Sequence, residues 1–99
     1  MTKSELIEKI VQTHGMLNMK VSEMLVNTVF DSIEEALKSG DKVEIRGFGS
    51  FKVKKRKGRM ARNPRTGAQV MVDEHFVPIF KVSKEMKQVV NENLKKGGV

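Results

Sequence analysis

The sequence predicts an α+β fold, in which a helical base carries a three-stranded antiparallel sheet that extends into a protruding β-ribbon arm. Apolar side chains recur at helical spacing through the first 38 residues, and residues 42–46 alternate apolar and polar side chains with a period of two. Asn63-Pro64-Arg65-Thr66-Gly67 then supplies the residues of a tight turn. At 99 residues the chain suits one modest core. We therefore expect a single domain over residues 1–99.

The first 40 residues are predicted to form a helical hairpin. Thr2-Lys3-Ser4-Glu5 fits a capping box, in which the Thr2 hydroxyl accepts a hydrogen bond from the Glu5 amide. The apolar residues that follow at helical spacing are Leu6, Ile7, Ile10 and Val11. This helix is expected to end near His14-Gly15, with Gly15 as its C-cap.

A second helix is predicted from between Asn18 and Val21 to Lys38-Ser39-Gly40. Its apolar stripe consists of Val21, Met24, Leu25, Val29, Ile33, Ala36 and Leu37. Val26 and Phe30 lie off this stripe, which indicates a second buried face. One short chain with a protruding arm cannot readily cover both faces, so we expect a dimer.

The sheet of the body is predicted from residues 41–53 and 76–82. Two glycines flank Phe48 and permit a sharp turn between the first two strands. If the distal turn is centred near Pro64-Arg65, Val53 lies opposite Val77 and Phe51 opposite Ile79. Pro78 cannot donate to a ladder and therefore indicates an edge strand or a bulge.

A last helix is predicted over residues 83–96. It starts near Ser83 and stops before Gly97-Gly98. Its apolar positions are Met86, Val89, Val90 and Leu94.

The intervening residues 54–75 are predicted to form the arm, which lies within the most basic part of the chain. The net charge is +7, from 19 basic and 12 acidic residues. Residues 45–72 hold nine basic residues and no acid, so the other 71 positions hold ten basic and 12 acidic residues. The nine are Arg46, Lys52, Lys54, Lys55, Arg56, Lys57, Arg59, Arg62 and Arg65. Charge concentrated in this way raises the local concentration of a polyanion.

The proline at the turn narrows the choice of polyanion. A basic hairpin that ends in an apolar ring without an N–H suits the minor groove of double-stranded DNA, where cations follow the phosphates and Pro64 wedges between base pairs. A solvated charge run is the alternative. An RNA binder would use the same cations, but the ribbon between Lys54 and His75 has no aromatic side chain to stack on bases. A binder of polyanions by charge alone would not need Pro64.

Other classes of function find little support. Without cysteine, the chain has neither a disulfide framework nor a Cys-based zinc site. His14 and His75 are far apart in sequence, so we expect no metal and no cofactor. The acids Asp31, Glu34 and Glu35 accompany no nucleophile, so we expect no enzyme and no catalytic residue. No apolar run approaches the length of a membrane span and the N-terminus is polar, which predicts a cytoplasmic protein without a membrane partner.

Several motifs resemble those of the HU/IHF family of bacterial nucleoid proteins along essentially the whole chain. They are Thr2-Lys3-Ser4-Glu5-Leu6-Ile7, Gly47-Phe48-Gly49-Ser50-Phe51, the arm tip from Gly58 to Gly67, and Val77-Pro78-Ile79-Phe80-Lys81. The resemblance implies an intertwined dimer whose two β-arms embrace DNA in the bacterial nucleoid. Minor-groove wedges and bending characterise HU and IHF themselves, so a preference for bent, nicked or kinked DNA is likewise what the resemblance implies.

By position, the resemblance also implies roles for individual residues. Pro64 would be the intercalating wedge, flanked by minor-groove contacts from Arg62 and Asn63. Further cations of the arm that would contact DNA are Lys54, Arg56, Arg59 and Arg65. Phosphate contacts along the flanks of the body would come from Lys3, Lys81, Lys84 and Lys87. Phe48, Phe51 and Phe80 match the aromatic core, where packing explains them.

The subfamily depends on Glu44-Ile45-Arg46. This triplet resembles the IHF β-type subunit, in which the arginine reaches the minor groove and the acid orients it. That reading implies a heterodimer with a related subunit and some sequence preference, whereas HU-type proteins often self-associate and bind with little preference. Glu44 and Arg46 also suit a plain solvent-facing strand pair. We expect an HU-like homodimer, since the sequence shows no specialised partner surface, and keep the IHF β-type subunit as the alternative.

Overall fold

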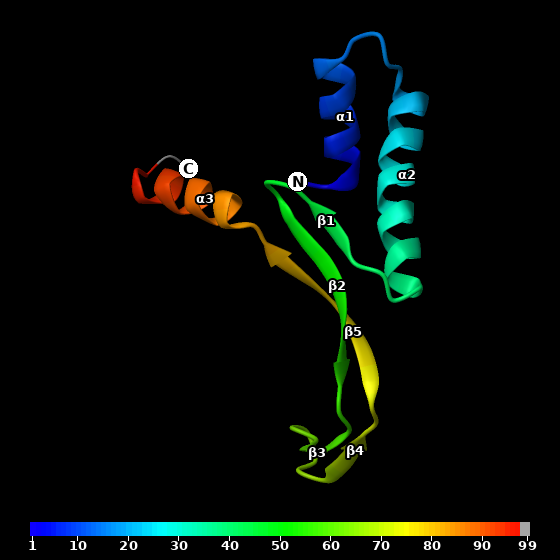
Figure 1. The fold of residues 1–99 in the computed structure, drawn as a ribbon, viewed down its shortest axis with the longest axis vertical. Coiled ribbons are helices and arrows are strands. Elements are labelled where there is room, and N and C mark those ends of the chain that lie inside the picture. The colour runs from blue at the N-terminus through cyan, green and yellow to red at the C-terminus, as the bar shows by residue number, and fades with distance from the viewer. Residues whose placement is uncertain (98–99) are drawn as a thin grey trace. The chain divides into compact units, whose positions relative to one another are not determined.

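The computed structural model describes residues 1–97; residues 98 and 99, including the Gly98 expected beyond the last helix, lie outside the described part. The described chain has an α+β fold, which confirms the predicted class (Figure 1). Its elements in order are α1 (Lys3–Thr13), α2 (Met19–Lys38), β1 (Val43–Ile45), β2 (Gly49–Arg56), β3 (Arg59–Arg62), β4 (Gln69–Val72), β5 (His75–Val82) and α3 (Lys84–Lys95). They divide into two compact units, Met1–Glu35 and Ala36–Val99, which are described separately below.

The first unit contains α1 and most of α2, each capped by a local side chain. The Thr2 hydroxyl accepts from the Glu5 amide at 3.1 Å, as the capping box predicts. Asn18 caps α2 in the same way, because its Oδ1 accepts from the Val21 amide at 2.8 Å. The prediction of Gly15 as a C-cap is wrong. His14 is the cap residue and Gly15 does not adopt a positive φ, because the turn is closed by the Leu17 amide donating to the His14 carbonyl.

In the single chain, the most buried positions in the first half of α2 lie off the predicted stripe. Val26, which lies off the predicted stripe, is only 4% exposed and shares its face with Ser22, four residues earlier, which is fully buried. Leu25 and Val29 of the predicted stripe are about half exposed in the single chain, as is Phe30 of the second face. Ser22 is polar and therefore does not enter a pattern of apolar residues. Its small side chain nevertheless occupies a buried position on the helix.

The second unit begins with the end of α2. Gly40 has a φ of 79° and its amide donates to the Leu37 carbonyl, while the Asp41 amide donates to the Ala36 carbonyl. These two hydrogen bonds form a Schellman motif, in agreement with the predicted stop at Gly40.

An antiparallel sheet with the order β1-β2-β5 follows. A tight turn joins β1 to β2, with Gly47 at a φ of 80° and the Phe48 amide donating to the Ile45 carbonyl. A Cβ at Gly49 would lie 2.5 Å from Cζ of Phe80 and 2.6 Å from the Lys81 carbonyl oxygen. The sharp turn predicted for Gly-Phe-Gly is therefore present, and the strands approach so closely that only glycine fits at Gly49.

The register of β2 and β5 differs from the prediction by one residue. Phe51 lies opposite Phe80, and Val53 opposite Pro78. The distal turn is centred between Arg65 and Thr66 and not at Pro64-Arg65, which shifts every pairing. Pro78 lies on β5, an edge strand with continuous pairing, so the edge position holds and no bulge is present.

The C-terminal helix α3 starts where predicted. The Ser83 hydroxyl accepts from the Met86 amide at 3.0 Å, and the Ser83 amide donates to the Phe48 carbonyl at 2.9 Å. This second bond ties the start of α3 to the turn between β1 and β2. The helix therefore leaves the sheet at the end opposite the arm (Figure 1).

Candidate nucleic-acid interface

The arm is a two-stranded ribbon that keeps one register from the body to its tip. β3 and β4 form a separate sheet, yet their pairing continues the alignment of β2 with β5, because Arg56 pairs with His75 and Arg59 with Val72. No residue is inserted on either strand between these pairs. The strand pairing of the body therefore also determines which residues face each other at the tip.

A close approach marks the junction between the two sheets. A Cβ at Gly58 would lie 3.0 Å from the Val72 carbonyl oxygen and 3.3 Å from the Glu74 amide nitrogen. A larger residue at Gly58 would therefore push the backbones of the two strands apart.

The tip is closed by hydrogen bonds that leave Pro64 exposed. The Gly67 amide donates to the Asn63 carbonyl at 2.7 Å, and the Asn63 amide donates to the Ala68 carbonyl at 2.8 Å. Gly67 has a φ of 72°, as the predicted turn requires. The Asn63 side chain accepts from the Arg65 amide at 2.9 Å, which holds the backbone on both sides of the proline. Asn63 is thus engaged in shaping the turn.

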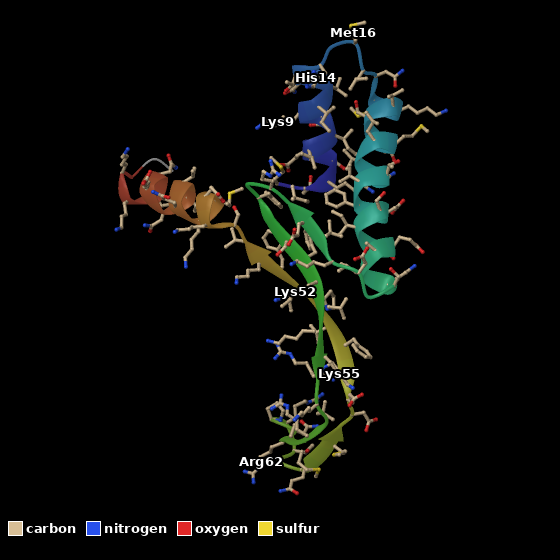
Figure 2. The ribbon with its side chains drawn as sticks, in the orientation of Figure 1. Lys9, His14, Met16, Lys52, Lys55 and Arg62 are labelled. Carbon is tan, nitrogen blue, oxygen red and sulfur yellow. The ribbon has the colours of Figure 1, made fainter. Side chains whose placement is uncertain are left out.

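The predicted contact cations are exposed along the ribbon but do not share one face. Lys54 and Arg56 lie on the face of β2 opposite Phe51 and Val53. In β3, the alternation places Arg59 and Arg62 on opposite faces. Figure 2 shows Lys52, Lys55 and Arg62 at successive positions from the sheet to the tip. The ribbon therefore presents positive charge on both sides and toward its end.

One of the nine clustered cations is neutralised by the return strand. The ammonium of Lys55 lies 3.2 Å from the Glu74 carboxylate, and both side chains remain more than half exposed. Residues 45–72 contain no acid, but the register brings Glu74 next to Lys55 from outside that range. A count along the sequence does not reveal this pairing.

Two predicted contact residues of the body lie together. Arg46 and Lys81 line an open depression of about 420 Å³, together with Ser50 and Ser83. Lys84 follows directly at the exposed first turn of α3, and Lys87 lies one turn further along the same helix. Lys3 belongs to the other unit, at the exposed start of α1.

The acid predicted to orient Arg46 has another partner. The Glu44 carboxylate lies 2.7 Å from the ammonium of Lys42. The hydrogen bond to Lys42 and its positive charge hold the pKa of Glu44 below its ordinary value. Within residues 1–97, no ion pair joins Glu44 to Arg46. The role of Arg46 in DNA binding stays a prediction.

The remaining observations concern the contacts among the phenylalanines, possible metal sites and possible membrane spans. Phe80 packs against Phe48 and Phe51, with ring centroids 5.4 and 4.7 Å away, although Phe48 and Phe80 remain partly exposed in the single chain. The described residues contain no group of three or more His, Cys, Asp or Glu placed to hold a metal ion. Over the same part of the chain, every helix is too short or too polar to cross a membrane.

The structure contains a sheet that extends into a cationic ribbon with a proline at its tip, an arrangement suited to DNA binding. Comparison with known proteins identifies the protein family. Residues 1–91 match the family described as bacterial DNA-binding protein. The chain is a member of the HU/IHF family of DNA-binding proteins. This membership agrees with the prediction that the chain is not an enzyme.

The similar proteins include both branches of the family. The chain is 47% identical over 97 residues to integration host factor subunit beta of Pseudomonas fluorescens, covering 98% of this chain and 99% of that protein. It is 50% identical over 92 residues to the same subunit of Azotobacter vinelandii, covering 93% and 100%. Among solved structures, an Anabaena HU–DNA cocrystal matches with a TM-score of 0.82 and 33% identity, covering 91% of this chain and 97% of that chain.

Proposed function

We propose that this protein is an IHF β-type subunit that pairs with a related subunit, binds the DNA minor groove with its arm and bends the duplex. One observation carries the choice of subfamily. Relatives named integration host factor subunit beta are 47% and 50% identical over nearly the whole chain, whereas the matching HU structure is 33% identical. This evidence favours the alternative over the HU-like homodimer that we expected from the sequence.

The arm supplies the affinity and the bend in this proposal. Exposed cations along both faces of the ribbon follow the two phosphate rims of the groove. Arg62, Asn63 and Arg65 surround the turn that presents Pro64, whose compact apolar ring enters a base step and unstacks it. On the body, Arg46 and Lys81 receive the DNA at their shared depression, and Lys3, Lys84 and Lys87 contact phosphates on its flanks.

The exposed apolar side chains support a dimer. Leu25, Val29 and Phe30 on α2 are about half exposed, as are Val90 and Leu94 on α3. Among the described hydrophobic residues only Ile7 and Val26 are buried, a core far too small for an independent domain of this length. A second subunit that covers these faces enlarges the hydrophobic core.

The choice of partner is tested by the mass of the purified protein. The 11.2 kDa chain is produced alone and, separately, together with a related subunit. Light scattering gives the mass of each preparation, and circular dichroism its helix content. The proposal predicts a stable heterodimer that forms in preference to any self-associated species. A stable dimer of the single chain supports the HU-like alternative, and a monomer with intact helices in both preparations contradicts both.

Bending is tested by Pro64→Ala, with Pro78→Ala as a matched control. Both variants keep every charge, but only Pro64 lies at the exposed tip, while Pro78 lies on an edge strand. Energy transfer between dyes at the ends of a ~35 bp duplex, longer than two helical turns of about 10 bp, reports the bend. Pro64→Ala should bind a straight duplex but bend it less and lose part of its preference for nicked DNA. Equal transfer for Pro64→Ala and wild type would show that the ribbon acts by charge alone.

A homodimer that binds DNA with little sequence preference is the second candidate, favoured by the TM-score of 0.82 to the HU–DNA cocrystal. Either form is proposed to act in the bacterial nucleoid. The two candidates differ in whether a related subunit is required and in whether Arg46 confers a sequence preference.

A further inference from the structure

Two methionines face each other near the end of the arm. The pairing of β3 with β4 places Met60 directly opposite Met71, so both side chains lie on one face of the ribbon. The next pair toward the tip on the same face is Arg62 with Gln69. The tip thus carries an apolar pair immediately beside a cation that the proposed function places in the minor groove.

The chain itself does not cover this pair. Met60 is 58% exposed and Met71 is 61% exposed. On the opposite face of the same two strands, Ala61 and Val72 are half-buried and Val70 is 47% exposed, so the methionine pair is the more exposed apolar pair. A large exposed thioether pair in a strongly cationic ribbon therefore has no role in the core of the described structure.

The charges around Met60 and Met71 indicate which ligand contacts them. Arg59 directly precedes Met60 and Arg62 follows it by two residues, while the nearest acid in sequence is Asp73, two residues after Met71. An acidic surface with apolar walls is complementary to this patch, and the minor groove of DNA offers both phosphates and the C–H edges of deoxyribose. Methionine is flexible and polarisable enough to adapt to such a wall.

We propose that Met60 and Met71 form an apolar contact site for the deoxyribose walls of the minor groove, next to the proline wedge. The inference rests on the proposed function and extends it, because it assigns part of the affinity to contacts that salt does not screen. Met60 lies in β3 and Pro64 in the turn beyond its end, four residues further on, a span of at most about 13 Å at roughly 3.3 Å per residue. The contact therefore falls within about four base pairs of the kink, at 3.4 Å per base pair.

The test compares two double variants on the same ~35 bp duplex, a length of more than two helical turns of about 10 bp. Met60→Gln with Met71→Gln keeps the size and charge of the side chains but makes them polar. Met60→Leu with Met71→Leu keeps them apolar and is the control. The glutamine variant should bind about tenfold more weakly, equivalent to roughly 60 Å² of lost apolar contact, with an unchanged salt slope. The leucine variant should remain within about twofold of wild type.

Two further measurements keep the result independent of folding. Peroxide transfers one oxygen to each thioether and leaves as water, and the resulting sulfoxide is polar. Treated wild type should lose affinity, while the treated leucine variant should lose much less, although five other methionines are oxidised in both. Hydroxyl-radical footprinting should show that the glutamine variant loses protection of the sugars about four base pairs from the kink, a spacing set by the 3.4 Å rise.

The outcomes separate this inference from the proposed function. Wild-type affinity in the glutamine variant, together with a weakened Arg59→Ala variant, overturns the methionine site and leaves the arm assignment intact. A change in oligomeric mass at unchanged DNA affinity assigns the pair to contact with another protein copy and also overturns it. Failure of the wild-type dimer to bind duplex DNA overturns both proposals.

Discussion

Removing the negative charge of Glu74 should strengthen DNA binding and make it more dependent on salt. Glu74 holds Lys55 in an ion pair at 3.2 Å, so this cation is compensated in the free protein. The variant Glu74→Gln keeps the shape of the side chain and releases Lys55 to a phosphate. Because both partners are more than half exposed, the loss of the ion pair should cost at most about 1 kcal/mol of stability.

The expected size follows from counterion release. Each additional phosphate neutralised steepens the slope of log K against log salt by about 0.9. For one such arm, the ratio of affinities at 50 and 200 mM salt should therefore grow by about 3.5-fold relative to wild type. If a dimer neutralises on the order of ten phosphates, the wild-type slope is near −9, so the change amounts to about a tenth of the whole.

Fluorescence anisotropy with a labelled duplex over a salt series measures the slope. Glu23→Gln provides the control, because it makes the same change in net charge at an exposed position of α2, which belongs to the other unit. If the salt slope of Glu74→Gln is no steeper than that of wild type or of Glu23→Gln, Lys55 does not reach a phosphate. That result would refute the interpretation that cations on both faces of the ribbon contact DNA.

Three further perturbations test other parts of the structure. Arg59→Ala should weaken all duplexes alike and flatten the salt slope by about 0.9 per arm; a loss confined to one DNA sequence would contradict a phosphate role. Gly49→Ala should destabilise the fold by about 1–3 kcal/mol in urea unfolding, because the new methyl group meets Phe80 and the backbone; unchanged stability would contradict the close approach. Lys42→Gln should raise the pKa of Glu44 toward its ordinary value in a carboxyl NMR titration. An unchanged pKa would show that Lys42 is not the partner of Glu44 in solution.

The sequence by itself determined the features that depend on neighbours within a few residues. The Thr2 cap, the start of the last helix at Ser83, the stop at Gly40 and the left-handed Gly67 of the distal turn are all present as predicted. A cap needs only a side-chain oxygen three residues before an amide, and a left-handed turn position needs only glycine. The α+β class followed from the two periodicities, and the tip motif indicated the family.

Only the tertiary structure decided which residues meet across larger separations. The hairpin register depends on where the turn closes, and one residue of difference moved Phe51 from Ile79 to Phe80. The same register created the Lys55–Glu74 ion pair.

The buried positions of α2 were also decided by the tertiary structure. Ser22 is fully buried in the described chain, although its polarity hides it from a hydrophobic pattern. Pattern reading ranks residues by their affinity for water, whereas burial is decided by which side chains leave room for the neighbouring backbone.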